Sequence, residues 1–144
     1  MTYTVLVTGD RNWDIDNDTH VDAITNELKT LVAYTVDDEG IRIVHGAARG
    51  VDTIAEAAAL VLGYDIAPYP AEWDKYHKAA GPKRNQQMLD EEHPNLVIAF
   101  HDDIKTSKGT KDMVKRALKA NVQVIHVQSD GKAWASVNGS LATL

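Results

Sequence analysis

Short apolar runs alternate with helical segments along most of this chain, and this alternation constrains the fold more than any other feature. The runs are typical of buried strands and cover residues 4–8, 41–44, 64–69, 96–100 and 122–127. Helical patterns separate them, at about residues 19–35, 53–62, 82–92 and 109–120. This order predicts an α/β fold with a mainly parallel five-stranded sheet and helices on both faces, joined by right-handed crossovers.

The length of the chain indicates one domain. At 144 residues it can bury a substantial core without disulfides or metals, and we expect the domain to span residues 1–127. The third run contains Pro68, which places that strand near an edge of the sheet. Two alternatives are open for residues 128–144, whose mixture of Ser, Gly and Ala suits either an additional edge strand or a partly disordered tail.

Sheets of this kind hold ligands outside the carboxyl ends of their strands, where the strand order reverses. The turns after the first, second and fourth runs should meet at that edge. These turns carry Gly9, Arg11 and Trp13; Gly46, Ala47, Arg49 and Gly50; and His101, Gly109 and Thr110. We therefore expect the binding site among these residues.

The stretch 44–52 has the pattern strand, glycine turn, helix. Gly46 and Gly50 would let the backbone turn sharply and approach a ligand closely. The helix that follows begins with unpaired N–H groups and the positive end of its dipole, which attract a phosphate or a carboxylate. Arg49 would add a charge-assisted hydrogen bond. A plain strand-to-helix turn is the alternative, since the stretch matches neither the Walker loop nor G-x-G-x-x-G.

A second glycine turn, at residues 108–110, offers further N–H groups and a hydroxyl. Arg11 and Arg84 would neutralise a phosphate, and an exposed Trp13 would stack on a base. Together these features predict a nucleotide-like ligand. The alternative is that the arginines are solvated and that Trp13 packs locally.

Three further polar residues lie near the predicted edge. Asp52 starts a helix, and it either caps that region locally or bonds a sugar hydroxyl and positions an arginine; both roles are open. His45 and His101 each follow a strand, and we expect them to be hydrogen-bonded wall residues. The six histidines show no metal-ligand spacing and the chain has no cysteine, so neither a metal nor another cofactor is expected.

Charge and hydropathy exclude several partners. The formal net charge of −6 argues against general nucleic-acid binding, which usually needs a basic face, but allows a small anion in a local basic pocket. No apolar run approaches the roughly 20 residues of a membrane span, and the N-terminal residues lack the pattern of a signal peptide. We expect a cytoplasmic protein, of a cell or of the host of a phage.

Six short motifs between about residues 4 and 127 form a specific combination. They are Thr8-Gly9-Asp10-Arg11, His45-Gly46-Ala47-Ala48-Arg49-Gly50-Val51-Asp52, Pro70-Ala71-Glu72-Trp73, Ala80-Gly81-Pro82-Lys83-Arg84-Asn85-Gln86-Gln87-Met88, Ala99-Phe100 and Lys108-Gly109-Thr110-Lys111-Asp112-Met113. Together they resemble the YspA-like branch of the SLOG superfamily, which is common in phages and bacteria. The resemblance implies a single Rossmann-like domain and relationship to Lonely Guy phosphoribohydrolases, the DNA-processing protein DprA and sensors of nucleotide-derived signals.

The resemblance also implies roles for single residues. Arg84 matches the arginine that Lonely Guy enzymes carry before the fourth strand, and Gly109 with Thr110 matches their phosphate-binding pair. Their catalytic glutamate falls on Met113, and a thioether can neither stabilise an oxocarbenium ion nor act as an acid or base. Asp112 lies one residue away, about 100° around the helix.

The first hypothesis from the sequence is a protein that senses or sequesters a nucleotide or a nucleotide-derived small molecule. Backbone amides near Gly9, Gly46 and Gly109 would hold its phosphate, with Arg84 and Asn85 beside them.

The alternatives come from two other classes of protein. The first is an enzyme that cleaves or transfers the N-glycosidic bond of nucleoside phosphates, with Arg84 and Asp52 as catalytic residues or with a carboxylate from Asp112 or residues 72–74. The second is a protein-interaction module that uses the aromatic loop around Trp73 and Tyr76. A homodimer is left open.

Overall fold

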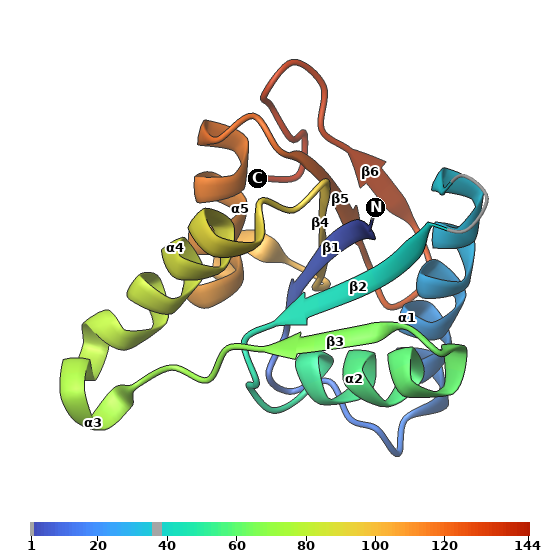
Figure 1. Ribbon diagram of the computed structural model, residues 1–144, viewed down its shortest axis with the longest axis horizontal. Helices are drawn as coiled ribbons and strands as arrows, with labels where there is room; N and C mark the ends of the chain where they lie inside the picture. Colours follow the sequence, from blue (N-terminus) through green and yellow to red (C-terminus); the bar gives the residue numbers. More distant parts are fainter. Residues whose placement is uncertain (1, 36–38) are drawn as a thin grey trace.

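A computed structural model describes residues 2–35 and 39–144 of the chain, in a six-stranded sheet with the order β3-β2-β1-β4-β5-β6 (Figure 1). The strands are β1 (Thr2–Gly9), β2 (Gly40–His45), β3 (Asp65–Pro68), β4 (Leu96–Phe100), β5 (Gln123–Val127) and β6 (Ala133–Ala135). The α-helices are α1 (Asp18–Thr30), α2 (Val51–Leu62), α3 (Trp73–Tyr76), α4 (Ala80–Glu92) and α5 (Gly109–Lys119).

Strands β1 to β5 pair in parallel, and β6 pairs antiparallel with β5. The mainly parallel sheet is therefore confirmed, and the C-terminal segment supplies the additional edge strand. β3, which contains Pro68, lies at the opposite edge. The chain runs outward from β1 through β2 to β3 and returns to the other side of β1 with β4. The strand order thus reverses between β1 and β4, the position that binds ligands in open α/β sheets.

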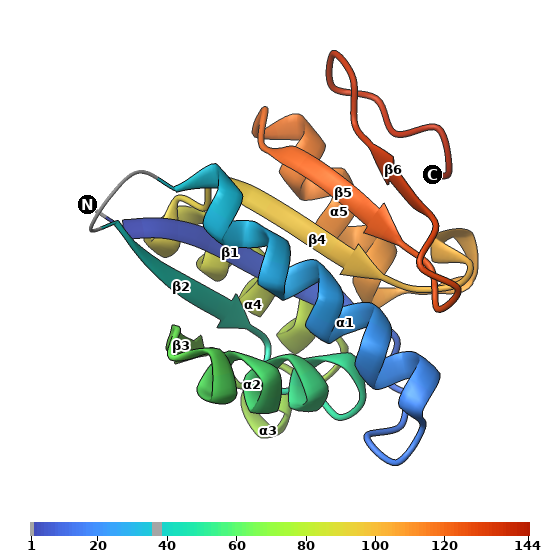
Figure 2. The same ribbon diagram turned by 90° about the vertical axis from the view of Figure 1, so that its right-hand side faces the viewer.

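Helices α1 and α2 cover one face of the sheet, and α4 and α5 cover the other (Figure 2). Successive side chains of a strand point to opposite faces, so a continuous apolar run fills two cores. In β1, Val5 and Val7 pack with Ile24 of α1, whereas Leu6 packs with Met113 of α5; all five are fully buried.

Local sequence signals account for several helix ends. The Asn17 side chain accepts a hydrogen bond from the N–H of His20 and caps α1. Gly63 and Asn121 take positive φ angles of 76° and 59° after α2 and α5, as their types indicate. Across residues 2–35 and 39–144, none of the helices is both long and apolar enough to cross a bilayer.

Three stretches differ from the expected pattern. Residues 70–80, expected to be a loop, contain α3 and the 3₁₀ turn His77–Ala79. The expected loop over 101–108 contains the 3₁₀ turn Ile104–Thr106, and the helix expected over 19–35 ends at Thr30 and continues as a 3₁₀ turn. Turns of three or four residues are too short to show a helical period, so the pattern misses them.

Candidate functional site

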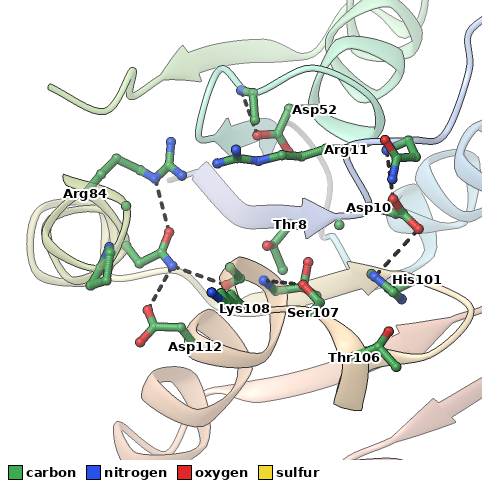
Figure 3. A pocket seen from close by; sticks show the side chains of 18 of the residues that line it. Thr8, Asp10, Arg11, Asp52, Arg84, His101, Thr106, Ser107, Lys108 and Asp112 are labelled. Atoms are coloured by element: carbon green, nitrogen blue, oxygen red, sulfur yellow. Dashed lines mark hydrogen bonds and ion pairs between the residues drawn. The ribbon is translucent and has the colours of Figure 1, made fainter. Parts of the chain in front are cut away.

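A cavity of about 660 Å³ opens at the carboxyl ends of β1 and β4, against α4 and the N-terminus of α5 (Figure 3). It lies where the strand order reverses, at the edge where the sequence predicts the site. Its polar and charged lining consists of Thr8, Asp10, Arg11, Asn12, Asp52, Lys78, Arg84, Asn85, His101, Thr106, Ser107, Lys108, Thr110 and Asp112. The sequence-predicted binding residues that line it are Gly9, Arg11, Arg84, Asn85, Gly109 and Thr110.

A second cavity of about 440 Å³ adjoins the first. The lining residues that the two cavities share are Arg11, Ala48, Trp73 and Arg84. The smaller cavity also contains the predicted residues Gly46, Ala47 and Arg49. The structure thus distributes most of the predicted binding residues over two adjoining cavities.

The N-terminus of α5 forms one wall of the larger cavity. The N–H of Thr110 donates to Ser107 Oγ at 3.0 Å, which satisfies one of the first N–H groups of the helix. Within the described parts of the chain, the N–H groups of Gly109 and Lys111 have no acceptor. These groups and the positive end of the helix dipole favour an anion here, and Lys108 adds a cation to the same wall.

The turn that leads into α2, in contrast, is occupied by a carboxylate of the protein itself. Asp52 Oδ2 accepts hydrogen bonds from the N–H groups of Gly46 at 3.1 Å and Ala48 at 3.2 Å. The N–H of Val51 donates to the carbonyl of Asp10 at 3.0 Å. This corrects the expectation that the amide of Gly46 is free for a phosphate, because an internal carboxylate takes that place. Of the two roles open for Asp52, the structure shows the local one.

Burial dominates the electrostatics of this part of the site. Asp52 is only 6% exposed, and burial raises its pKa although His45, the two N–H groups and Arg84 act in the opposite direction. Burial also lowers the pKa of Arg84; Asp52 opposes this change and the nearby Arg11 adds to it. The two arginines are therefore close enough to repel each other.

Arg84 is held by the backbone of two loops. Its NH1 group donates to the carbonyl oxygens of Gly46 and Tyr69, the latter at 3.2 Å, and its Nε donates to Asn85 Oδ1 at 3.1 Å. A Cβ atom at Gly46 would overlap the guanidinium, so the close approach at this glycine is to Arg84. Among the described residues, NH2 of Arg84 has no acceptor and is available to a ligand.

Asn85 connects Arg84 to α5. Its Nδ2 donates to Asp112 Oδ2 at 2.9 Å, and the same oxygen accepts from Arg116 Nε at 2.8 Å. Within the described residues both bonds go to Oδ2, which leaves Asp112 Oδ1 available. Met113, where the Lonely Guy motif has its glutamate, is fully buried in the core. The carboxylate that α5 presents to the cavity is therefore that of Asp112.

Trp73, at the start of α3, lines both cavities and is 46% exposed. The guanidinium carbon of Arg11 lies 5.4 Å from the centre of its ring, at cation–π distance. A Cβ atom at Gly81 would lie 3.3 Å from the indole edge, so this glycine lets the ring pack closely on α4. Trp73 is thus the aromatic wall of the two cavities.

Trp13 does not take the predicted position. It is 4% exposed, and its ring stacks on His20 at a centroid distance of 4.8 Å and tilts against Phe100 at 6.2 Å. It lines neither cavity. The expectation of an exposed Trp13 that stacks on a base is therefore wrong, because the ring fills the core beside α1; local packing, the stated alternative, is observed.

Two of the predicted glycines bring β1 and α2 together. Gly50 has a φ angle of 80°, and a Cβ atom there would overlap the backbone of Asp10 and Arg11. A Cβ atom at Gly9 would lie 2.6 Å from Val51 Cγ2. Gly50 lines neither cavity, so its place in the structure is one of packing.

His45 and His101 share one hydrogen-bond arrangement. Each Nδ1 accepts the N–H of the residue two positions later, at 3.0 and 2.9 Å. An accepting Nδ1 leaves the proton on Nε2, which faces Glu56 Oε1 at 3.0 Å in His45 and Asp10 Oδ2 at 3.6 Å in His101. Both are hydrogen-bonded as expected, but only His101 is a wall residue: it lines the larger cavity, whereas His45 lines neither. Across the described ranges, no group of three or more His, Cys, Asp or Glu residues could hold a metal ion.

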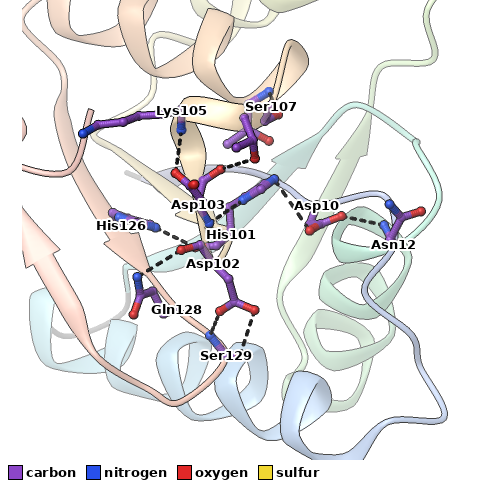
Figure 4. A network of polar contacts seen from close by, with 12 residues as sticks. Asp10, Asn12, His101, Asp102, Asp103, Lys105, Ser107, His126, Gln128 and Ser129 are labelled. Atoms are coloured by element: carbon purple, nitrogen blue, oxygen red, sulfur yellow. Dashed lines mark hydrogen bonds and ion pairs between the residues drawn. The ribbon is translucent and has the colours of Figure 1, made fainter.

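A polar network ties the C-terminal segment to the loop between β4 and α5 (Figure 4). His126 Nε2 donates to the carbonyl of His101 at 2.6 Å, and its Nδ1 meets the Thr143 hydroxyl at 2.6 Å. Asp102 accepts from the N–H and the hydroxyl of Ser129 at 2.8 and 3.0 Å. His126 is 1% exposed, and burial lowers its pKa. The tail therefore steadies the loop that carries His101.

Sequence reasoning missed Trp73, Lys78 and Lys108 as cavity residues. A signal was present for Trp73, because it belongs to one of the six motifs and to a loop rich in aromatic and charged residues. Lys108 begins another of the six motifs and Lys78 lies in the same loop as Trp73, but the sequence pattern singles out neither as a ligand contact. Their positions follow from the short helical turns that precede α4 and α5, which the sequence pattern does not predict.

Comparisons with known proteins found one family and one phage relative. A family model described as YspA, cpYpsA-related SLOG family matches residues 3–76. The Gene 61 protein of Mycobacterium phage D29 is 34% identical over 127 residues, which cover 85% of this chain and 94% of that protein. No solved structure matches the chain.

Proposed function

The chain belongs to the YspA, cpYpsA-related SLOG family, and we propose that it binds a nucleotide or a nucleotide-derived small molecule in the larger cavity, to sense or sequester it. The observation that carries this proposal is the N-terminus of α5, where the Gly109 and Lys111 N–H groups have no acceptor among the residues that the structure describes. Cavities for small ligands measure roughly 300–1,000 Å³, and this one measures about 660 Å³.

The phosphate of the ligand would lie against α5. Two free N–H groups and the helix dipole favour it there, Lys108 lies on the same wall, and Arg84 offers its free NH2 group. The cavity is lined by four cations, Arg11, Lys78, Arg84 and Lys108, and by three carboxylates, Asp10, Asp52 and Asp112. The local balance therefore favours an anion although the chain carries a formal net charge of −6.

The remaining parts of a nucleotide also find partners. The exposed indole of Trp73 is a flat surface on which a base can stack. Asp112 Oδ1 is an acceptor suited to a ribose hydroxyl, and its position is fixed by Asn85 and Arg116 through the other oxygen.

A thermal-shift screen of nucleosides and of nucleoside mono-, di- and triphosphates tests this proposal. A ligand at a hundred times its Kd adds about 2.7 kcal/mol to the unfolding free energy, which raises Tm by several degrees at about 2–8 °C per kcal/mol. Lys108→Gln should weaken binding of a phosphorylated hit about tenfold. Lys115→Gln, an equal charge change at an exposed position of α5 outside the cavity, should not. A screen without any shift, or equal losses in both variants, would contradict the proposal.

A second candidate is hydrolysis of the N-glycosidic bond of a nucleoside phosphate, and the position of Asp112 favours it. Asp112 Oδ1 is available to activate a water for attack on C1′ of the ribose while the base departs and takes up a proton. Asp52, which the sequence predicts for this role alongside Asp112 and the carboxylates of residues 72–74, is engaged by two N–H groups. Incubated with a nucleotide that the thermal-shift screen selects, the protein should release free base, which chromatography detects. Asp112→Asn should abolish this release while the nucleotide still binds. Binding without release would leave the sensor as the function.

A further inference from the structure

The smaller cavity has an unusual charge pattern. Three arginines line it, Arg11, Arg49 and Arg84, and its other lining residues, all within the described chain, include neither Asp nor Glu. The larger cavity, in contrast, combines four cations with three carboxylates. A single phosphate held at α5 would reach Arg84 through its NH2 group but would leave Arg11 and Arg49 without a phosphate partner.

The arrangement of the arginines suits an anion between them. Figure 3 shows the side chains of Arg11 and Arg84 reaching toward each other from opposite sides of the end of β1. Arg84 is fixed by the carbonyl groups of Gly46 and Tyr69, so it cannot turn away. Guanidinium groups bind phosphate in a bidentate manner, and an anion between like charges would remove their repulsion.

We propose that the smaller cavity is a second phosphate site for the same ligand, so that the ligand is a nucleotide with two or more phosphates in series. This inference rests on the proposed function. The first phosphate lies at the N-terminus of α5, and the next lies among Arg11, Arg49 and Arg84. The two cavities adjoin along Arg11, Trp73 and Arg84, so a phosphate chain passes directly from one to the other.

Two side chains in this passage can adapt to a ligand. Within the described residues, the Arg11 guanidinium makes no hydrogen bond and rests on the Trp73 ring, so it can turn toward a phosphate without breaking one. Arg49 is exposed and held by one hydrogen bond to Asn12 Oδ1, at 3.3 Å. Arg49 lines the smaller cavity but not the larger one, so substituting Arg49 tests the second phosphate site without changing the lining of the first.

Isothermal titration calorimetry with the four ribonucleoside mono-, di- and triphosphates tests the proposal. For the base that binds, the di- or triphosphate should bind about tenfold more tightly than the monophosphate. Arg49→Gln should remove this gain and leave monophosphate binding unchanged, whereas Lys115→Gln, the matched loss of charge outside both cavities, should retain the gain.

The outcomes separate this inference from the function on which it rests. If mono- and triphosphates bind equally to the natural protein, or if the gain survives in Arg49→Gln, the second phosphate site is overturned and the nucleotide-binding function stands. If no nucleotide binds at all, both are overturned. Arg49 is exposed, so its substitution does not endanger the fold.

Discussion

Two helices begin at the carboxyl edge of the sheet, α2 and α5, and the turns that lead into them are occupied differently. The second residue of α2 is Asp52, whose carboxylate binds the N–H groups of Gly46 and Ala48 in the preceding turn. The second residue of α5 is Thr110, which carries no charge, and the N–H of Gly109 beside it has no acceptor within the described chain.

Asp52 is one source of this difference, and the backbone is another, because the residue before α2, Gly50, has a φ of 80°, whereas the residue before α5, Lys108, has a φ of −78°. Both helices follow a strand and a turn with glycine, and both have a positive dipole end at the same edge. Where the sequence supplies Asp52, its carboxylate hydrogen-bonds the preceding turn. The carbonyl of Gly46 in that turn then accepts a hydrogen bond from Arg84. Where the sequence supplies threonine, the helix end is available to a ligand.

Removing the internal anion should have the largest effect. Asp52→Ala leaves the N–H groups of Gly46 and Ala48 without their partner in a buried turn, and a buried unsatisfied donor costs about 1–3 kcal/mol. We expect the unfolding free energy to fall by about 3 kcal/mol in urea denaturation followed by circular dichroism. Asp112→Ala, at a half-buried position, should lose about 1 kcal/mol. Equal losses of unfolding free energy in the two variants would contradict the larger structural role that we assign to the Asp52 carboxylate.

Replacing Thr110, the second residue of α5, with the aspartate that α2 has at that position should place an internal carboxylate at the start of α5. Thr110→Asp places a carboxylate beside the free N–H groups, so it should weaken nucleotide binding by about 2 kcal/mol, roughly thirtyfold, in calorimetry. Thr110→Asn, of the same size but neutral, should lose clearly less. If the aspartate variant bound the nucleotide as tightly as the asparagine variant, an internal carboxylate would not be what keeps a ligand away from the start of α2.

Loss of the hydrogen bond between Ser107 and the first turn of α5 should cost stability and spare binding. Ser107→Ala removes the acceptor of the Thr110 N–H, which should lower the unfolding free energy by about 1 kcal/mol. The N–H of Gly109 is untouched by this change, so nucleotide affinity should stay within about twofold. Urea denaturation and calorimetry on the same sample measure both quantities, and a large fall in affinity would mean that the hydroxyl itself contacts the ligand.

The pH dependence of stability should show the smallest effect. Burial raises the pKa of Asp52 above its ordinary 3.8 in the folded protein. The stability that protonated Asp52 contributes is therefore fully present below pH 3.8 and is lost as the pH rises through the raised pKa. The natural protein should lose unfolding free energy relative to Asp52→Asn as the pH rises from about 4 to 7. A difference that stays constant, or that changes in the opposite direction, would contradict this assignment.

The sheet and the place of the site could be predicted from the sequence because both depend on patterns along the chain. Continuous apolar runs identify β1 and β4, and the alternation with helices determines which strand ends meet. The same reasoning placed Gly109, Thr110 and Arg84 at one edge, and they line one cavity.

The details of the site could not be predicted because they depend on contacts between distant segments. Trp13 and Trp73 both occur in polar stretches, and only the packing of α1 on the sheet decides that Trp13 is buried and Trp73 exposed. The sequence leaves the role of Asp52 open for a similar reason, because the geometry of the turn at Gly46 decides whether its carboxylate binds the preceding amides or a ligand.

The most direct test of this account is a ¹⁵N-edited NMR titration of the protein with the nucleotide selected by the screen. With the monophosphate form of that nucleotide, whose single phosphate would lie at α5, we predict that the amide signals of Gly109 and Lys111 shift and saturate, while those of Gly46 and Ala48 shift much less because Asp52 binds them. Saturating shifts at Gly46 and Ala48 with none at Gly109 would contradict this prediction, since the ligand would then lie at α2 and not at α5.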